Sequence, residues 1–391
     1  MIGRKQIVIL GCLLMIGLAG LCGCGSPSSD SMERVETEAD HAADVPGGLT
    51  YESSMELQYA KNFSVDDYEG GYKILKTMDG TQILVVPEEK EVPDGISKDV
   101  VVVKQPVKNL YVVSSSIMDI FSKLDAMDAI RLSSQKEEDW YVQDAKDAME
   151  RGDILYAGKY SKPDYELIVS ENCSLAIENT MITHSPEVSE MLADFDIPTM
   201  IEYSSYESHP LGRVEWVKFF GALIGKDELA QKIFDEEVRL VDEVTSVEKT
   251  DKTVAFFYVT SNGLIQVRSS SDYVPKMINL AGGNYIPTNI GDPDSKRSTV
   301  SMQIEDFYDQ AKDVDFIIYN SSIDGGIGSV QELLDKCAVL KDFKAVKEGN
   351  VWCTTNDMYQ QSMSIGYLIH DMHAMLQGKD QVDMTYLFHV E

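Results

Sequence analysis

Residues 208–247 read SHPLGRVEWVKFFGALIGKDELAQKIFDEEVRLVDEVTSV, and this stretch predicts two consecutive helices. The first begins at Ser208 or His209, has Pro210 in its first turn, and ends at Gly225. The second begins at Lys226 and shows the apolar spacing of an amphipathic helix, with Leu229, Ile233, Val238, Val241 and Val244. At 1.5 Å per residue it spans roughly 30 Å, about the width of a small domain. We interpret it as a strut between two lobes, although a surface helix of one large domain would show the same pattern.

Length and composition limit the possible classes of protein. A chain of 391 residues is longer than one core usually fills, so two domains are expected, and 43% of its residues are hydrophobic. The formal net charge is −31, from 65 acidic and 34 basic residues. Such a charge repels phosphates and anionic lipids alike, which argues against a nucleic acid partner.

The N-terminus has the features of an export signal. Arg4 and Lys5 precede an apolar run at residues 7–21, which is too short for a membrane span but suits a signal peptide. The next residues, Leu21-Cys22-Gly23-Cys24, resemble a bacterial lipoprotein box, in which the cysteine after a small residue is lipidated. We therefore expect a signal peptide at 1–23, lipidation of Cys24, and a location on the extracytoplasmic face of the cell membrane. A plain secreted protein is the alternative.

Residues 24–48 have almost no large apolar side chain and are expected to form a flexible tether.

The cysteines outside the signal favour neither zinc binding nor a disulfide framework. Beyond the tether, Cys173, Cys337 and Cys353 lack metal-binding spacing. A bridge between Cys337 and Cys353 stays open, with buried thiols as the default.

Strand and helix signals alternate on both sides of the two helices. Residues 63–78 and 81–87 read as a hairpin that turns at Asp79-Gly80. From Val100 onward, short apolar strands are separated by helices of about ten residues, which implies parallel sheets. We predict an α/β fold of two Rossmann-like lobes, at 49–224 and 251–391, with mostly parallel sheets, a linking helix at 225–250, and a ligand cleft between the lobes.

Several segments in order resemble one protein family. They are Pro163-Asp164-Tyr165-Glu166, Ser174-Leu175-Ala176-Ile177, Ile197-Pro198, Leu223-Ile224-Gly225 before the long helix, and AVKEGNVW at 345–352. Together they resemble the substrate-binding proteins of ABC importers, in the class with a rigid helical hinge that binds iron-siderophore complexes, haem or cobalamin. Ser174 departs from the aspartate that is usual there.

The resemblance implies that the lobes close slightly on a metal chelate and that the loaded protein docks on an ABC permease with its ATPase. Iron transport with a ferric siderophore as ligand is the main expectation, and cobalamin or haem is the alternative. The protein would act as a monomer without a cofactor. In the family, one glutamate from each lobe meets permease arginines. Glu166 matches the first, and Glu305 the second more loosely, with Asp306 beside it.

Ligands of such sheets bind at the carboxyl ends of the strands. Ser114 to Ser116 follow a strand there, and they could offer backbone N–H groups to a ligand or simply cap the next helix. Tyrosine and amide side chains suit an aromatic chelate with polar edges. The ligand-binding candidates chosen in this way are Ser115, Lys159, Tyr160, Asn179, Thr180, Tyr203, Tyr206, His209, Tyr258, Asn262, Asn320 and Tyr359.

Two arginines complete the candidate site. Arg213 and Arg268 could hold an anionic chelate, or could instead pair with one of the many carboxylates. Arg268 and the segment 203–209 are expected to grip the ligand most firmly. His184, His209, Met181 or Met358 could coordinate haem iron, whereas a protein-built zinc or manganese site would need more ligands.

The sequence also bears on two other classes of function. It lacks a G-x-S-x-G elbow, a phosphate loop and a zinc spacing, so we expect no enzyme activity. A lipoprotein that binds a partner protein, with no role in transport, stays an alternative.

Overall fold

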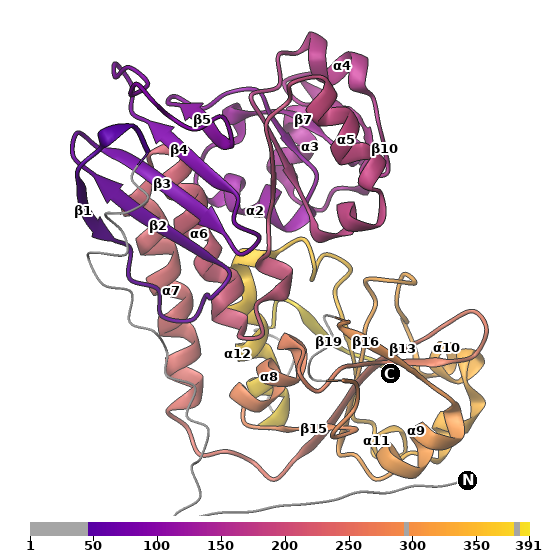
Figure 1. Cartoon of the computed structure of the whole chain (residues 1–391). Coiled ribbons are helices and arrows are strands. Elements are labelled where there is room, and N and C mark those ends of the chain that lie inside the picture. The colour runs from indigo at the N-terminus through magenta and orange to yellow at the C-terminus, as the bar shows by residue number, and fades with distance from the viewer. Residues whose placement is uncertain (1–45, 293–296, 379–383) are drawn as a thin grey trace, which may run out of the picture. The chain divides into compact units, whose positions relative to one another are not determined.

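The computed structural model describes residues 46–292, 297–378 and 384–391. Residues Asp44–Glu391 form one compact unit. Within the described residues, three sheets of five or more strands are arranged with helices around them (Figure 1). The predicted signal peptide, Cys24 and most of the predicted tether lie outside the described residues.

The two predicted helices are present and end where the sequence indicates. Helix α6 spans Pro210–Ile224, and the ring nitrogen Nδ1 of His209 accepts the backbone N–H of Leu211 at its start. Gly225 ends α6 with a φ of 74°, a conformation that glycine adopts without steric cost. Helix α7 then spans Asp227–Thr245. The buried face of α7 differs in part from the predicted one, because Leu229 is exposed while Phe234 and Leu240 pack inward.

The N-lobe sheet is entirely parallel. Its strand order is β12-β11-β6-β7-β8. The strands are β6 (Leu110–Val112), β7 (Ile130–Ser133), β8 (Leu155–Tyr156), β11 (Leu175–Glu178) and β12 (Thr199–Ile201). The helices between them are α2 (Ser115–Lys123), α3 (Gln143–Glu150), α4 (Tyr165–Ser170) and α5 (Pro186–Asp194). The chain leaves β6 toward β7 on one side and returns to β11 on the other, so the order reverses between β6 and β11. Such a reversal opens a crevice at the carboxyl ends of the two strands.

The C-lobe sheet has a parallel centre and antiparallel edges. Strands β15, β13, β17 and β18 pair in parallel, while β14, β16 and β19 pair antiparallel to their neighbours. These strands are β13 (Thr253–Val259), β14 (Ile265–Arg268), β15 (Asn284–Ile286), β16 (Thr299–Met302), β17 (Phe316–Tyr319), β18 (Val351–Thr354) and β19 (Leu387–His389). The helices are α8 (Tyr273–Leu280), α9 (Ile304–Ala311), α10 (Val330–Lys336), α11 (Lys344–Lys347) and α12 (Ile365–Leu376). The last of these, α12, packs against α7.

A separate N-terminal sheet precedes the N-lobe sheet. It comprises β1 (Tyr51–Ser54), β2 (Phe63–Tyr68), β3 (Tyr72–Thr77), β4 (Gln82–Val86) and β5 (Val100–Lys104). The expected strand at 63–78 is therefore two strands. They are joined at Gly70 and Gly71, both at a φ of 85°, which permits a turn that the apolar alternation alone does not reveal.

Helix α6 and the segment just before it anchor the N-terminal sheet through two buried carboxylates, Glu215 in the helix and Glu207 ahead of it. Glu215, which is fully buried, accepts backbone N–H groups of Gln58, Tyr59 and Ala60 at 2.9, 2.8 and 2.8 Å, and its other contact is Lys218 Nζ at 3.0 Å. In the same way, Glu207 accepts the N–H groups of Lys61 and Asn62. Buried acceptors of this kind fix the chain that enters β2 onto the helix.

We expect Glu215→Ala to lower the free energy of unfolding by about 3–5 kcal/mol, because it leaves Lys218 buried without its partner and three N–H groups without an acceptor. The measurement is urea unfolding of the purified variant. Glu190→Ala, at an exposed position on α5, is the control and should change stability by less than about 0.5 kcal/mol. A loss below about 1 kcal/mol for Glu215→Ala would show that the anchor is not needed.

Two further features concern cysteines and membrane segments. Cys173, Cys337 and Cys353 are free thiols, so the bridge between Cys337 and Cys353 is not formed. Cys353 is buried as expected, whereas Cys173 and Cys337 are partly exposed. Among the described residues, no helix combines the length and apolarity that crossing a membrane requires.

Candidate functional site

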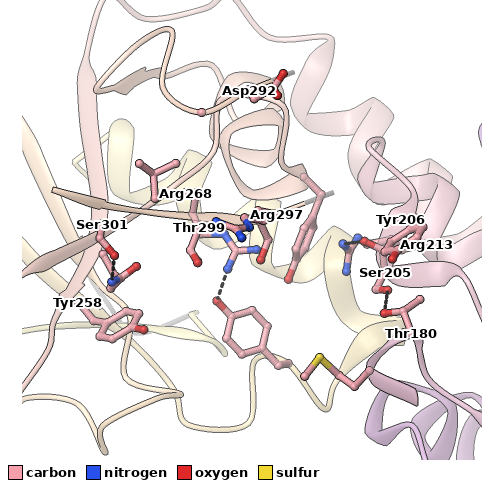
Figure 2. Close-up of a pocket in the computed structure, with 17 residues that line it drawn as sticks. Thr180, Ser205, Tyr206, Arg213, Tyr258, Arg268, Asp292, Arg297, Thr299 and Ser301 are labelled. Carbon is pink, nitrogen blue, oxygen red and sulfur yellow. Dashed lines mark hydrogen bonds between the residues drawn. The ribbon is translucent and has the colours of Figure 1, made fainter. Parts of the chain in front are cut away.

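A large cavity lies between the lobes, beside the segments that follow β11 and β12. Its volume is about 1280 Å³, and we call it the outer chamber (Figure 2). Thr180, Ser205, Tyr206 and Arg213 line it from the N-lobe, after β11 and β12 and at the start of α6. The C-lobe contributes residues of β14 and β16, together with Tyr258, Tyr273 and Tyr359. A cavity of this size can hold a bulky ligand.

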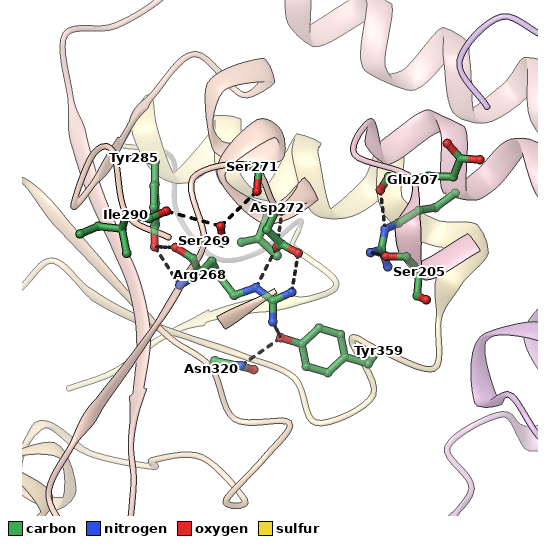
Figure 3. Close-up of polar contacts among 12 residues, drawn as sticks. Ser205, Glu207, Arg268, Ser269, Ser271, Asp272, Tyr285, Ile290, Asn320 and Tyr359 are labelled. Atoms are coloured by element: carbon green, nitrogen blue, oxygen red, sulfur yellow. Dashed lines mark hydrogen bonds and ion pairs between the residues drawn. The ribbon is translucent and has the colours of Figure 1, made fainter. Parts of the chain in front are cut away.

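Arg268 lies in the wall of the outer chamber, already paired with a carboxylate. Its Nε and Nη2 each donate to one oxygen of Asp272 at 2.8 Å, and its Nη1 donates to the hydroxyl of Tyr359 at 3.3 Å (Figure 3). Only 8% of Arg268 is exposed. The bidentate pair with Asp272 fixes the guanidinium and balances its charge. Arg268 therefore offers a ligand hydrogen-bond donors at a fixed position, and its charge is not free to pair with an anion.

Neighbouring groups hold the Arg268 pair in place. Asn320, buried behind the wall, donates to the hydroxyl of Tyr359 at 3.0 Å. The hydroxyl of Tyr285 bonds both the N–H and the carbonyl of Arg268. Asp272 also caps α8 by accepting the N–H of Val274. The orientation of Arg268 and Tyr359 is therefore set before any ligand arrives (Figure 3).

Arg213 faces Arg268 across the chamber in a different environment (Figure 2). Its Nη2 donates to the carbonyl of Ser205 at 2.6 Å, and its Nε donates to the carbonyl of Glu207 at 3.3 Å. The guanidinium lies 3.7 Å from the centre of the Tyr273 ring. Among the described residues, no carboxylate forms a salt bridge with Arg213. Its positive charge is thus held in position and remains available to an anionic ligand.

The tyrosines of the chamber act as hydrogen-bond donors. Burial raises the pKa of Tyr258, and the nearby Tyr359 raises it further. Burial also raises the pKa of Tyr273. A phenol is protonated at neutral pH even at its ordinary pKa, and the raised pKa extends that range to higher pH, so both groups can donate to oxygens of a ligand. Arg297 and Asp292 add a charge of each sign to the same lining.

A second, smaller cavity of about 320 Å³ adjoins the first, and we call it the inner chamber. Thr180, Met181, Ser205, Arg213, Tyr273 and Tyr359 line both chambers. The residues found only in the inner chamber include Ser114 to Ser116 and Asn179, which follow β6 and β11, and the segment that leads into α12. The strand reversal thus lies beside the inner chamber.

The structure brings together many of the residues expected to bind ligand. Eight of these candidates line a chamber, namely Ser115, Asn179, Thr180, Tyr206, Arg213, Tyr258, Arg268 and Tyr359. The other six do not belong to the lining of either chamber, namely Lys159, Tyr160, Tyr203, His209, Asn262 and Asn320.

The six lie elsewhere for local reasons, and Asn320 is the one buried behind the wall, where it donates to Tyr359. Lys159 and Tyr160 follow the edge strand β8, which is distant from the strand reversal, and Asn262 lies in the turn between β13 and β14. His209 is used as a helix cap and stacks on Tyr59 with ring centres 4.5 Å apart. Tyr203 is buried beside Asp79, and burial together with that carboxylate raises its pKa to about 12.

Several lining residues were not predicted from the sequence. Gln266 and the residues Ser298 to Ser301 reach the outer chamber from β14 and β16, which are antiparallel strands. The rule of strand carboxyl ends applies to parallel strands, so it could not find them. Alternation along β14 was the available signal, because Gln266 and Arg268 are two residues apart and therefore share a face.

Metal-binding groups are sparse in the described part of the chain. No group of three or more histidine, cysteine, aspartate or glutamate side chains there could hold a metal ion, and no described histidine lines either chamber. His373 contacts the carbonyl of Ala281, and His184 is exposed beyond the lining.

The two glutamates expected to dock on a permease are both solvent-exposed. Glu166 lies in the first turn of α4, which Asp164 caps, and Glu305 lies in the first turn of α9 beside exposed Asp306. Figure 1 shows α4 on the N-lobe and α9 on the C-lobe. Neither glutamate lines a chamber.

Comparison with known sequences finds relatives of unassigned activity. No family model matches the chain. Two proteins of Methanocaldococcus jannaschii, both called uncharacterized lipoproteins, are 22% identical over 378 residues and 24% identical over 407 residues. These alignments cover 91% and 99% of this chain, and 89% and 100% of the two relatives.

Comparison with solved structures finds two-lobe binding proteins. A possible iron-binding periplasmic solute-binding protein of Staphylococcus epidermidis has a TM-score of 0.54 at 16% identity, covering 70% of this chain and 99% of that one. A periplasmic haem-binding protein of Vibrio cholerae has a TM-score of 0.55 at 13% identity, covering 67% and 97%. One from Pseudomonas aeruginosa has a TM-score of 0.55 at 11% identity, covering 73% and 98%. The chain therefore has the fold of the two-lobe periplasmic binding proteins of ABC transporters, the class that its sequence resembles.

Proposed function

We propose that this chain is the substrate-binding lipoprotein of an ABC importer, which captures an anionic iron complex of the ferric-siderophore type between its lobes. The observation that carries the proposal is the outer chamber, which combines the cation of Arg213, for which no salt bridge is found among the described residues, with phenol donors and the rigid Arg268 wall. Anionic chelates need such a fixed cation and such donors in a protein that is otherwise strongly acidic.

The scarcity of metal-binding side chains supports a complete chelate as the ligand. Iron that is already surrounded by chelator oxygens needs no further bond from the protein, so hydrogen bonds and charge at its periphery are enough. Haem or cobalamin would enter the same chamber as alternative ligands, and Tyr258 or Met181 could approach a haem iron. The loaded protein would then deliver its ligand to a permease driven by its ATPase.

The proposal divides the chain by role. Residues 1–23 would be removed as a signal peptide, 24–48 would tether the protein, and 225–250, which include α7, would join the lobes 49–224 and 251–391. We expect the two lobes to close only slightly around the ligand, because a continuous helix bends less than paired loop hinges do.

An uptake assay tests the function. Cells with and without the gene are supplied with radiolabelled iron as a ferric tris-catecholate, and cell-associated iron is counted over time. We expect uptake to fall at least tenfold without the gene and to return when the gene is supplied. Equal uptake by both strains would contradict a role in importing this class of chelate, and the same assay with haem or labelled cobalamin then tests the alternative ligands.

Lipid anchoring gives a separate prediction. Cys24→Ala should leave the protein unprocessed or released from the membrane, because stable attachment requires the acyl chains that Cys24 would carry. Membrane and soluble fractions are compared by immunoblotting, with Cys22→Ala as the control that should remain anchored. A Cys24→Ala protein that stays firmly membrane-bound after cleavage at another site would contradict the assignment.

A further inference from the structure

The inner chamber has a composition that the outer chamber lacks. Seven of the residues that line it are serines, and the lining also includes Asn179, Thr180 and Gln361. Its cation is Arg213, at the wall shared with the outer chamber, and its carboxylate is Glu202. The described lining is therefore rich in small neutral groups that both donate and accept hydrogen bonds.

The carboxylate of the inner chamber is already satisfied. Glu202 is 1% exposed, and its two oxygens accept from the Ser114 hydroxyl at 2.7 Å and from the backbone N–H of Ser204 at 2.8 Å. The remaining lone pairs of the carboxylate can accept from a neutral hydroxyl or amide N–H of a ligand. The small neutral groups that make up most of the polar lining favour a neutral partner.

The first turn of α2 provides donors to such a partner. Ser114 occupies the cap position of α2, but its side chain forms no cap hydrogen bond and instead reaches Glu202 and the hydroxyl of Ser116. The expectation that these serines simply cap the helix is therefore not met by Ser114. Backbone N–H groups of the first turn are left without a side-chain acceptor, and a ligand carbonyl or hydroxyl can accept from them.

Aliphatic side chains and three tyrosines, Tyr273, Tyr359 and Tyr386, complete the lining of the chamber. Ile120, Ile365, Leu368 and Met358 line it beside the hydroxyl groups. Hydroxyl and aliphatic surfaces side by side fit a short alkyl chain that bears polar groups. The volume of about 320 Å³ is a quarter of the 1280 Å³ of the outer chamber, which suits a portion of a ligand and not a second whole chelate.

The walls of the inner chamber come from both lobes. Ser362, which precedes α12, donates to the carbonyl of Ser116 at 2.6 Å, and the N–H of Met363 donates to Asp119 at 2.7 Å. An occupant of this chamber touches the junction at which the lobes meet. Its binding can therefore favour one arrangement of the lobes over another.

We propose that the ligand is a chelate with a neutral arm, an alkyl chain bearing hydroxyl or amide groups, that enters the inner chamber while its anionic iron core stays in the outer chamber. This inference rests on the proposed function, since it divides one ligand between two chambers. The shared wall that includes Arg213, Tyr273 and Tyr359 lies where the arm joins the core.

Calorimetric titration of the purified full chain with three matched probes tests the inference. The probes are a ferric tripodal tris-catecholamide without an arm, the same complex with one hydroxyethyl-amide arm, and the same complex with a butyl arm of similar length. We expect the hydroxyethyl-amide complex to bind at least tenfold more tightly than the armless one, with the butyl complex between them.

A variant that fills the inner chamber tests where the arm lies. Ser115 lines that chamber and is the first residue of α2, so Ser115→Phe adds bulk where the helix begins. We expect this variant to lose the preference for the hydroxyethyl-amide arm. The matched variant Thr299→Phe, in the outer chamber, should weaken all three probes and keep the preference. Thermal melting of both variants verifies that they fold.

The outcomes separate the inference from the function on which it rests. Equal binding of the armed and armless probes by the parent protein would overturn the inference and leave the proposed function standing. A preference that survives Ser115→Phe but disappears in Thr299→Phe would place the arm in the outer chamber and also overturn it. Failure of all three probes to bind the parent would contradict the proposed function for this class of chelate.

Discussion

Removing Glu166 and Glu305 together is expected to reduce chelate uptake at least tenfold while leaving chelate affinity within about twofold. Both side chains are exposed at the first turns of α4 and α9, one on each lobe, and neither lines a chamber. An exposed charge contributes little in water, but one that is desolvated against permease arginines contributes several times more. The double variant should therefore bind normally and fail at delivery.

The docking experiment measures uptake and affinity with the same variants. Glu150→Ala with Glu348→Ala removes two exposed carboxylates, one on each lobe, and is the control for net charge. That control should keep uptake close to the parent level. Normal uptake by the Glu166 and Glu305 variant would refute the docking role, and weakened chelate binding would place these carboxylates at the ligand site instead.

Arg213→Ala should weaken binding of an anionic ferric tris-catecholate by at least tenfold. The guanidinium is stacked on Tyr273 and held by two backbone carbonyls, so its orientation is fixed without a salt bridge to a described carboxylate. Removing a cation that pairs with a desolvated anion costs on the order of 2–5 kcal/mol, equivalent to a factor of about 30 or more. Calorimetric titration of the parent and the variant provides the comparison.

Two controls make the Arg213 result specific. Arg239→Ala removes a cation from the exposed side of α7, where Arg239 pairs with Glu236 and Glu243, and should leave affinity unchanged. Arg213→Lys keeps the charge but loses the planar stacking on Tyr273, so an intermediate affinity is expected. Unchanged affinity in Arg213→Ala would show that the ligand is neutral or lies elsewhere.

The sequence was most informative where local chemistry determines structure. Pro210 and Gly225 mark the limits of α6, and both limits appear in the structure, because the missing N–H of proline and the left-handed φ of glycine act within one turn. The strand-end rule likewise found Ser115, Asn179 and Thr180, since parallel strands on either side of the order reversal end at one crevice.

The sequence was least informative where contacts made only in the folded structure determine the role of a side chain. Arg268 appeared to be the stronger anion-binding candidate, but the pairing with Asp272 that balances its charge depends on the exact path between β14 and α8. Arg213 gained importance because Tyr273, sixty residues away, supplies the surface on which it stacks. The division of the N-terminal region at Gly70 and Gly71 was missed because apolar alternation continues on both sides of the turn.

Direct titration of the purified protein with metal chelates of different charge tests the central claim most directly. The account predicts saturable one-to-one binding of a ferric tris-catecholate, tighter than binding of a neutral ferric trihydroxamate, and no comparable binding of free manganese or zinc ions. Trp140, Trp216 and Trp352 are all buried, so their fluorescence offers a second report of any lobe movement. Saturable binding of a bare metal ion, or no binding of any iron complex, haem or cobalamin, would contradict the account.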